Sequence, residues 1–216
     1  MSDMVYAPPP DTPVILHQDE DVVFVDKPAG LLSVPGRGPD KSDCMIARLA
    51  RIYPEILLVH RLDQDTSGVM VFARTAAAQR HLGQQFETRK TRKYYIARVA
   101  GHVGETEGHV DLPLIVDWPN RPLQKVCHET GRPAQTDWKL IRHEQGASRL
   151  RLMPVTGRSH QLRVHMLAIG HVILGDTLYA TGDALDHPRL MLHAQSLRLK
   201  HPATGHSMTI TAPVPF

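Results

Sequence analysis

Two strand–turn–strand patterns constrain the fold of this chain most, one at residues 14–25 and the other at residues 191–211. The first places a polar turn at residues 18–21 between two apolar runs, and the second places the turn HPATG at residues 201–205. Short apolar runs that are separated by turn residues are typical of β-hairpins. The sequence therefore predicts antiparallel strands in both regions.

Between these hairpins the pattern predicts more strands than helices. The expected strands cover residues 69–73, 94–100, 136–141 and 150–155. Three helices are expected: one capped by Ser42 or Asp43, one capped by Thr75, and one capped by Ser159 and ended by Gly170. We expect an α+β fold with a largely antiparallel or mixed sheet. An extended, proline-containing leader over residues 1–12 is expected to precede a single domain over residues 13–216.

The composition is that of an ordinary globular protein, because 42% of the 216 residues are hydrophobic and 22% are charged. No apolar run approaches the roughly 18 residues that cross a bilayer, so no membrane association is expected. The two cysteines, Cys44 and Cys127, have no metal-ligand spacing and are expected to be reduced thiols. The sequence thus predicts a cytoplasmic protein.

A local basic run matters more than the net charge of +3. Arg89, Lys90, Arg92 and Lys93 place four cations within five residues. Such a run can bind a phosphate backbone, although a solvated charged surface is the usual explanation of a single run. The residues alone leave both interpretations open.

The segment that most resembles a catalytic loop is the polar stretch at residues 59–69, which lies between two apolar stretches. Loops that are held by strands often carry catalytic groups. Asp63 can act there as a base or a nucleophile, and Asp65 is expected to accept hydrogen bonds from the loop backbone. The alternative is a purely structural turn that uses aspartate and glycine for their backbone preferences.

A second polar segment, residues 155–165, combines a loop with the start of a helix. Helix N-termini attract anions, and Arg158 and Arg163 can each pair with a carboxylate or a phosphate. The alternative is a surface helix with ordinary salt bridges. In the strand before it, Tyr94 and Tyr95 are expected to face opposite sides. Either one of them faces a cleft, or both simply pack.

Metal and nucleotide signatures are missing from the sequence. The 14 histidines include no HExxH pattern, and there is neither a Walker A loop nor a GxGxxG motif. We therefore expect no metal and no cofactor.

Five motifs, in one order, carry a family resemblance. HRLDQDTSG at residues 60–68 resembles the HRLDxxTSG signature of the RluA family of pseudouridine synthases. The other four resemble further segments of that family: KPAGL at 27–31, RPAQT at 132–136, GRSHQLRVH at 157–165 and LHA at 192–194. The resemblance covers about residues 14–212.

The resemblance implies a fold, a reaction and a set of site residues. The implied fold is a bent, mostly antiparallel mixed sheet with flanking helices and a central RNA-binding cleft. The implied reaction is the isomerisation of uridine to pseudouridine in RNA. Catalytic roles are implied for Asp63, for Tyr95, which stacks on the base, and for Arg163, which pairs with the aspartate. Leu162 would form an apolar wall, and RNA contacts are implied for Arg61, Arg89, Lys90, Arg92, Lys93, Arg158 and His160.

Residues 112–115 and 117–122 resemble one member of the family in particular, which lacks an S4 RNA-binding domain. This implies two targets, a uridine in a tRNA anticodon loop and one in 23S ribosomal RNA, and a monomer is expected. The alternatives to a synthase are a non-catalytic RNA-binding module, a phosphotransferase and a metal-dependent nuclease. The phosphotransferase lacks the glycine-rich loop and DFG that a kinase-like HRD loop requires, and the nuclease lacks metal ligands.

Overall fold

The computed structural model describes residues 6–216, which divide into two compact units. Unit 1 runs to Thr91 and resumes at Ala194–Val214, whereas unit 2 comprises Arg92–His193 and Pro215–Phe216. Residues 1–5 of the expected leader lie outside the described part, and residues 6–12 form neither helix nor strand. The single domain expected over residues 13–216 stays a prediction, because compactness does not show whether a unit folds by itself.

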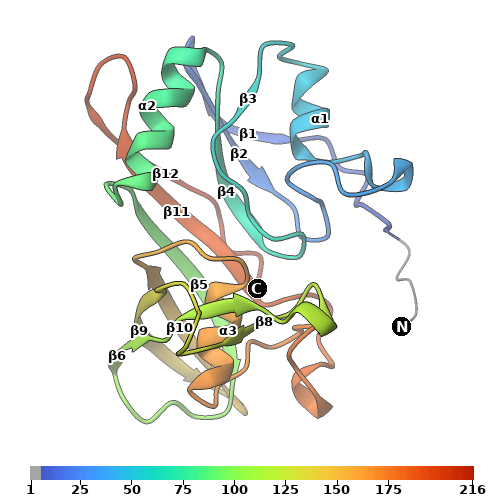
Figure 1. Ribbon diagram of the computed structural model, residues 1–216, viewed down its shortest axis with the longest axis vertical. Helices are drawn as coiled ribbons and strands as arrows, with labels where there is room; N and C mark the ends of the chain where they lie inside the picture. Colours follow the sequence, from blue (N-terminus) through green and yellow to red (C-terminus); the bar gives the residue numbers. More distant parts are fainter. Residues whose placement is uncertain (1–5) are drawn as a thin grey trace. The chain divides into compact units, whose positions relative to one another are not determined.

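Unit 1 is built on a sheet whose strand order is β1-β2-β4-β11, in which β2 pairs antiparallel with both β1 and β4. Its strands are β1 (Val14–Gln18), β2 (Val22–Lys27), β3 (Leu57–Leu58), β4 (Ser67–Ala73), β11 (Leu192–Lys200) and β12 (Ser207–Thr211). The short β3 pairs with β4, and β12 pairs with β11. Its helices are α1 (Met45–Ala50), α2 (Ala76–Glu87) and the 3-10 helix η1 (Pro39–Lys41). Both hairpins are therefore confirmed (Figure 1).

The strands of unit 1 enclose a core against α2. Phe24, Val69 and Val71 contribute from the sheet, and Ala78 and Leu82 contribute from the helix. All of β4 is buried, as its unbroken apolar run predicts. Burial of this apolar surface stabilises the sheet to which β4 belongs, and β4 directly follows the Asp63 loop.

The two predicted helix caps of unit 1 have different outcomes. The hydroxyl of Thr75 accepts the N–H of Ala78 at 3.1 Å, which confirms it as the cap of α2. The predicted cap of α1 by Ser42 or Asp43 is wrong, because Cys44 occupies that position without a side-chain hydrogen bond. The carboxylate of Asp43 instead accepts two hydrogen bonds from the guanidinium of Arg48.

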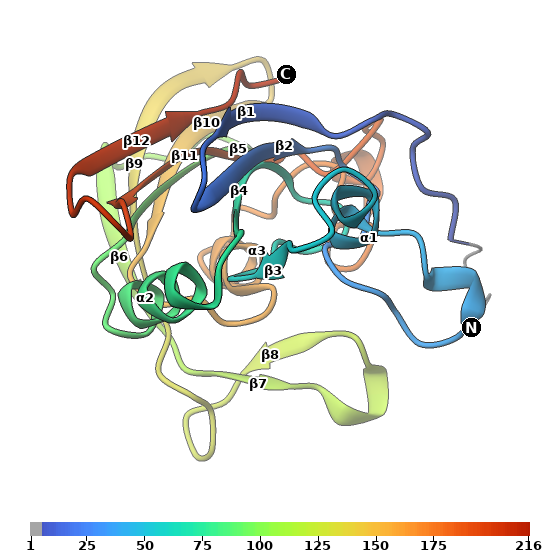
Figure 2. The same ribbon diagram turned by 90° about the horizontal axis from the view of Figure 1, so that it is seen from above.

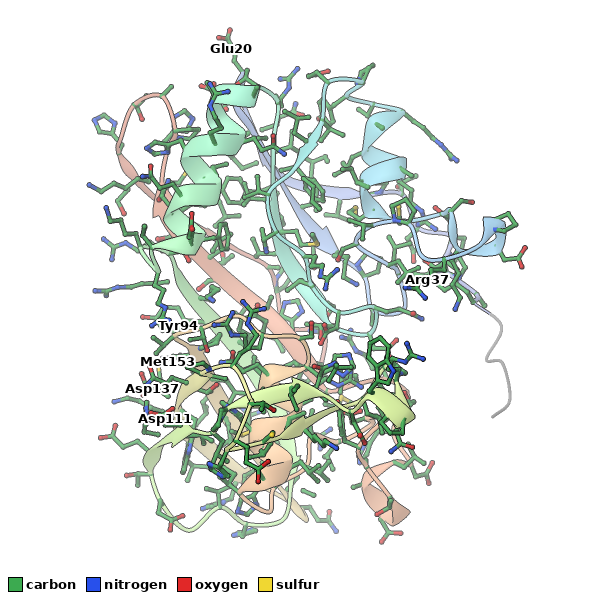
Figure 3. The ribbon with its side chains drawn as sticks, viewed as in Figure 1. Glu20, Arg37, Tyr94, Asp111, Asp137 and Met153 are labelled. Atoms are coloured by element: carbon green, nitrogen blue, oxygen red, sulfur yellow. The ribbon has the colours of Figure 1, made fainter. Side chains whose placement is uncertain are left out.

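Unit 2 contains a second run of antiparallel strands, in the order β5-β10-β9-β6. These are β5 (Arg92–Ala100), β10 (Ala147–Pro154), β9 (Gln135–Glu144) and β6 (Glu107–Asp111). Figure 3 labels one residue on each, Tyr94, Met153, Asp137 and Asp111, and these follow one another in the same order. The helix α3 (Gln161–Ala168) packs Leu162 and Met166 into the core of this unit. The predicted α+β class with antiparallel strands is confirmed.

A separate two-stranded ribbon belongs to unit 2 and was not predicted. It consists of β7 (Leu114–Val116) and β8 (Gln124–Val126), joined by the 3-10 helix η2 (Trp118–Asn120), and is visible as a distinct hairpin in Figure 2. Three-residue strands are too short for a period-two pattern to stand out. The short strands β3 and β6 and the 3-10 helix η3 (Gly182–Ala184) were also not predicted.

The start of α3 differs from its prediction. Ser159 does not cap it; His160 occupies the cap position with a left-handed φ of 52° and no side-chain cap. The amide oxygen of Gln161 instead accepts the main-chain N–H of Arg158 at 3.0 Å. The helix ends just before Gly170, as expected, and the φ of 86° at this residue explains the choice of glycine. No helix among residues 6–216 is long and apolar enough to cross a bilayer.

Candidate active site

The loop that carries Asp63 lies between β3 and β4, and its main chain is held on both sides of the aspartate. The hydroxyl of Ser33 donates to the carbonyl oxygen of Leu62 at 2.7 Å and accepts the Leu62 N–H at 3.1 Å. The N–H of Gly30 donates to the carbonyl oxygen of Gln64 at 3.0 Å. Because both neighbours are fixed, the direction in which the Asp63 side chain leaves the backbone is fixed as well.

Lys27 is a third anchor of this loop and is fully buried. Its ammonium group donates to the carbonyl oxygens of Pro28, Leu31 and Gln64, at 2.8, 2.6 and 2.8 Å. Three charge-assisted hydrogen bonds offset the desolvation of the buried cation. Lys27 therefore ties the KPAGL motif directly to the residue that follows Asp63.

Within the loop, the turn closes through the main chain. The N–H of Thr66 donates to the carbonyl oxygen of Asp63 at 3.2 Å. The expectation that Asp65 accepts hydrogen bonds from the loop backbone is wrong, because among residues 6–216 its carboxylate accepts none. At the end of the loop, Gly68 has a φ of 114°, and a Cβ there would lie 2.3 Å from the carbonyl oxygen of Ala194. Only glycine fits at this close approach.

The side chain of His60 holds the backbone at the start of the Asp63 loop. Its Nε2 accepts the N–H of Val71 at 3.1 Å, and its ring stacks on Phe86 with centroids 4.5 Å apart. The adjacent Arg61 is exposed. The guanidinium of Arg61 is thus presented to solvent from an ordered backbone.

In unit 2, the amide of Gln161 organises the start of α3. Its oxygen accepts hydrogen bonds from the Thr156 hydroxyl at 2.7 Å and from the Arg158 N–H. Its nitrogen donates to the carbonyl oxygen of Gln135 at 2.9 Å and to the Thr136 hydroxyl at 3.0 Å. The buried amide uses all four of its hydrogen-bonding positions, so the loop before α3 is joined firmly to β9.

Arg163 forms a buried, bidentate ion pair with Asp176. Its Nε and Nη2 donate to the two carboxylate oxygens at 2.7 and 2.5 Å, and the side chains are 2% and 0% exposed. Asp176 also accepts the main-chain N–H groups of Leu178 and Tyr179. Asp176 is a residue that the sequence did not single out, and the expected pairing of Arg163 with Asp63 stays a prediction.

His165 is buried and neutral. Its Nε2 donates to the carbonyl oxygen of Leu112 at 3.0 Å, and its Nδ1 lies 2.9 Å from the Thr136 hydroxyl. Because a carbonyl oxygen only accepts, the proton of the neutral ring lies on Nε2, and Nδ1 accepts from the Thr136 hydroxyl. Burial lowers the pKa of His165 below its ordinary value, and the hydrogen bond to the Leu112 carbonyl opposes this only in part.

The two neighbouring tyrosines of β5 have different surroundings, as their predicted opposite directions require. The guanidinium of Arg151 lies 5.8 Å from the ring centre of Tyr94. Tyr95 packs against the core cluster of unit 2, to which Leu162 belongs. Both Tyr95 and Leu162 are therefore held by apolar packing.

The basic run spans the boundary between the two units. Arg89 and Lys90 follow α2 and are exposed, and Arg89 has a left-handed φ of 58°. Arg92 is exposed at the start of β5, whereas the ammonium of Lys93 donates to the carbonyl oxygen of Thr156 at 3.2 Å. Lys93 therefore has a structural contact in addition to its expected contact with RNA.

Arg158 and His160 also make contacts within unit 2. The Nε of Arg158 donates to the carbonyl oxygen of Pro133 at 3.1 Å. The Nδ1 of His160 lies 2.8 Å from the Tyr179 hydroxyl, which accepts the N–H of Gln124 at 2.8 Å. Tyr179 thus joins the start of α3 to the β7–β8 hairpin.

One group of side chains in the described part of the chain has the spacing of metal ligands, namely Asp19, Asp21 and His201 in unit 1. The Nδ1 of His201 accepts the N–H groups of Ala203 and Thr204, at 3.3 and 3.2 Å. The proton of the neutral ring therefore lies on Nε2, which donates to Asp19 at 3.2 Å. The three side chains therefore link the turn at residues 18–21 to the turn at residues 201–205 by a hydrogen bond, which accounts for their proximity without a metal ion.

Sequence reasoning missed the structural roles of Lys27 and Asp176. Lys27 had a usable signal in the sequence. Lys27 is a cation at the end of the apolar run VVFV, where a charge must find buried partners. Asp176 had no such signal, because the tight turn at Gly175, with its φ of 71° and its close approach to Arg189, is visible only in the structure.

The motif positions agree with comparisons to known proteins. Residues 21–168 match the family model described as RNA pseudouridylate synthase. The chain is 55% identical over 212 residues to the dual-specificity RNA pseudouridine synthase RluA of Escherichia coli K12, covering 96% of this chain and 97% of that protein. It is 51% identical to the protein of the same name in Vibrio vulnificus, covering 100% and 89%.

Solved structures show the same similarity. Human RNA pseudouridylate synthase domain containing 1 superposes with a TM-score of 0.80 at 28% sequence identity, covering 97% of this chain and 87% of that one. Human RNA pseudouridylate synthase domain containing 4 superposes with a TM-score of 0.75 at 25% identity, covering 94% and 88%.

Proposed function

Because this chain belongs to the RNA pseudouridylate synthase family and isomerises uridine in RNA, we propose that Asp63 is its catalytic carboxylate and that it has two kinds of RNA target. The observation that carries the proposal is the Asp63 loop. Its signature residues stand in a backbone that Ser33, Gly30 and Lys27 hold on both sides of the aspartate. Such preorganisation is what a reacting group requires.

The reaction needs no external atoms or electrons. The N1–C1′ bond of uridine breaks, the base turns, and C5 forms a bond to C1′. A carboxylate can assist by attack at C1′, by attack at C6, or by removal of a sugar proton on the way to a glycal. Asp63 is proposed for this step.

Two residues of unit 2 complete the proposed chemistry. Tyr95, packed against the apolar core, stacks on the base and helps to remove the C5 proton. Arg163 holds the catalytic carboxylate ionised. Its bidentate contact with Asp176 supports this role, since it fixes the guanidinium before substrate binds. Leu162 contributes the apolar wall.

RNA must be opened before a carboxylate can reach the sugar. Flipping the target nucleotide costs a few kcal/mol, and the exposed Arg61 is proposed to fill the space that the base leaves. Arg89, Lys90, Arg92, Lys93, Arg158 and His160 are proposed to contact the RNA backbone. Such contacts position the substrate but do not read its sequence.

The proposed targets are a uridine in a tRNA anticodon loop and a uridine in 23S ribosomal RNA. The identity to proteins named as dual-specificity synthases, over nearly the whole chain, supports two targets. We expect the enzyme to act as a monomer in the cytoplasm. A non-catalytic RNA-binding module is not supported, because the relatives that match are synthases.

Tritium release from C5-labelled uridine tests the proposal directly. Wild-type protein should release tritium from both tRNA and 23S ribosomal RNA transcripts. Asp63→Asn should release none while it binds the same RNAs with nearly unchanged affinity, because the aspartate supplies chemistry and the cations supply affinity.

The matched control is Asp65→Asn, two residues along the same loop, which should keep wild-type activity. Release from only one RNA would refute the dual specificity. Clear product from Asp63→Asn over many hours would refute the role of the carboxylate.

A further inference from the structure

The tip of the β7–β8 hairpin exposes an aromatic side chain. Trp118 is 65% exposed, more than any other large hydrophobic residue in the described part of the chain. Tryptophan is usually well buried, because its ring has a large apolar surface. The second tryptophan, Trp138, follows that rule with 6% exposure. The exposed ring of Trp118 is therefore a candidate for contact with a binding partner.

The backbone of the tip is ordered by its own hydrogen bonds. The carboxylate of Asp117 accepts from the side chains of Asn120 and Lys125, at 2.8 and 3.0 Å. Three main-chain hydrogen bonds close the turn: the N–H groups of Asp117, Asn120 and Leu123 donate to the carbonyl oxygens of Leu123, Asp117 and Asn120, at 2.8, 2.9 and 3.1 Å. Trp118 is thus presented from a preorganised turn, which lowers the entropy cost of binding.

The base of the hairpin connects to the start of α3. Leu114 packs with Ala134 and Val164, and Val126 packs against the same cluster. The Tyr179 hydroxyl accepts the main-chain N–H of β8, as described above. The hairpin therefore belongs to the same unit as Arg158 and His160, for which RNA contacts are proposed.

Arg121 gives the tip a positive charge beside the ring. Its guanidinium carbon lies 4.0 Å from the centre of the Trp118 ring. Among residues 6–216, no carboxylate pairs with Arg121, whereas Asp117 is already paired with Lys125. An aromatic face with an adjacent, uncompensated guanidinium matches the chemistry of a nucleotide, which has a flat base and an anionic phosphate.

The surroundings of the ring favour RNA over a protein partner. Pro119, Asn120, Arg121 and Pro122 are exposed with Trp118, so an amide and a guanidinium interrupt the apolar surface of the tip. A stable protein interface buries about 800 Å² on each side, whereas stacking of one base needs only one ring.

We propose that the hairpin tip binds an unpaired nucleotide of the substrate RNA, with the base stacked on Trp118 and a phosphate bound by Arg121. The proposal rests on the RNA-modifying function proposed above. It adds a binding subsite that lies outside the motifs from which the chemistry was assigned. It also commits to a base that is unpaired, because a base within a duplex has no free face to stack.

Binding measurements with two RNA probes test this subsite. The probes are an anticodon stem-loop and a fully paired duplex with the same stem. Trp118→Ala should weaken stem-loop binding about 5- to 150-fold, the range expected for loss of one base–aromatic stack. Duplex binding should not change, and Trp118→Phe should retain most of the affinity. Leu185→Ala, which removes a 42% exposed side chain from the same unit, is the control and should have no effect.

Salt dependence separates the base contact from the phosphate contact. Trp118→Ala should leave the slope of log affinity against log salt unchanged, while Arg121→Ala should reduce its magnitude by about 0.7, the value for one single-strand phosphate. Intrinsic fluorescence gives a direct signal, since the stem-loop should quench wild-type protein but not Trp118→Phe.

The failure of this proposal is distinguishable from failure of the proposed function. If wild-type protein releases tritium while Trp118→Ala binds the stem-loop as tightly as wild type, only the subsite is refuted. Equal losses for stem-loop and duplex would also refute base stacking. If wild-type protein neither binds nor modifies the RNAs, both proposals fail.

Discussion

The Asp63 loop and the start of α3 both carry signature motifs, but the protein holds them in different ways. The loop is fixed through its main chain, because Ser33 and Lys27 bind the carbonyl oxygens of Leu62 and Gln64. The start of α3 is instead fixed through motif side chains. Gln161, Arg163 and His165 use their polar atoms on neighbours within unit 2, as the contacts above show.

Because of this difference, substitution of a motif residue is expected to have different effects in the two segments. In the loop, Ser33, Gly30 and Lys27 lie outside the HRLD motif, and from the motif itself the side chain of His60 adds a hydrogen bond with the N–H of Val71. In the segment at residues 157–165, several polar side chains are part of the scaffold. A substitution there is expected to cost stability first, whereas a substitution at Asp63 is expected to cost chemistry.

The largest effect on stability is expected from the buried ion pair. Asp176→Asn keeps the shape of the side chain but leaves the charge of Arg163, which is 2% exposed, without its bidentate partner. Breaking one side of a buried pair costs roughly 3–5 kcal/mol. Urea denaturation of both proteins measures this difference.

Glu107→Gln is the matched control, because Glu107 pairs with Lys139 at the surface of the same unit. An exposed pair contributes roughly 0–1 kcal/mol. Equal losses for Asp176→Asn and Glu107→Gln would contradict a scaffold role for the buried pair.

A somewhat smaller loss is expected in the loop. Lys27→Met removes the ammonium and leaves buried carbonyl oxygens without their donor, at a cost of about 1–3 kcal/mol for each unsatisfied group. The loop backbone should also relax, so the turnover number should fall in the fraction that remains folded. Denaturation and tritium-release assays on the same samples separate the two effects.

The comparison within the loop is Asp65→Asn. Since the Asp65 carboxylate accepts no hydrogen bond within the described part of the chain, its replacement should change stability by less than about 0.5 kcal/mol. A large loss at Asp65 would show that the loop depends on its side chains after all.

The smallest effect on stability is expected when the pH is lowered, through the protonation of His165. Burial keeps the pKa of His165 below the ordinary value of about 6.5, so below that pH the unfolded chain binds more protons than the folded one. Stability should therefore fall as the pH drops below about 6.5, until the lowered pKa is passed. His165→Gln should lose this part of the pH dependence in thermal melts between pH 5 and 8.

Because the chain has 14 histidines, the useful quantity is the difference between the two pH profiles. His128→Gln, a change at an exposed histidine of the same unit, controls for the loss of an imidazole. If the His165→Gln profile is parallel to that of wild type, the neutral, buried state of His165 does not contribute.

Much of the fold could be predicted because its signals are local. The apolar runs of β2 and β4, the turn at residues 201–205 and the Thr75 cap each depend on neighbouring residues only. The predicted caps at Ser42 or Asp43 and at Ser159 failed because partners elsewhere, or a left-handed backbone, replaced a local rule. The three-residue strands β7 and β8 were too short to show a pattern.

The sequence by itself determined the family and the candidate carboxylate, since nine consecutive residues carry the signature around Asp63. It also showed that no apolar run is long enough to cross a membrane. Only the tertiary structure decided that Asp176 is the buried partner of Arg163 and that Lys27 holds the loop. It also revealed the exposure of Trp118. The Arg163–Asp176 and Lys27–Gln64 contacts join residues that are 13 and 37 positions apart, and the exposure of Trp118 reflects how little of the chain packs against its ring. Their energy depends on distance and burial, which no local pattern of residues encodes.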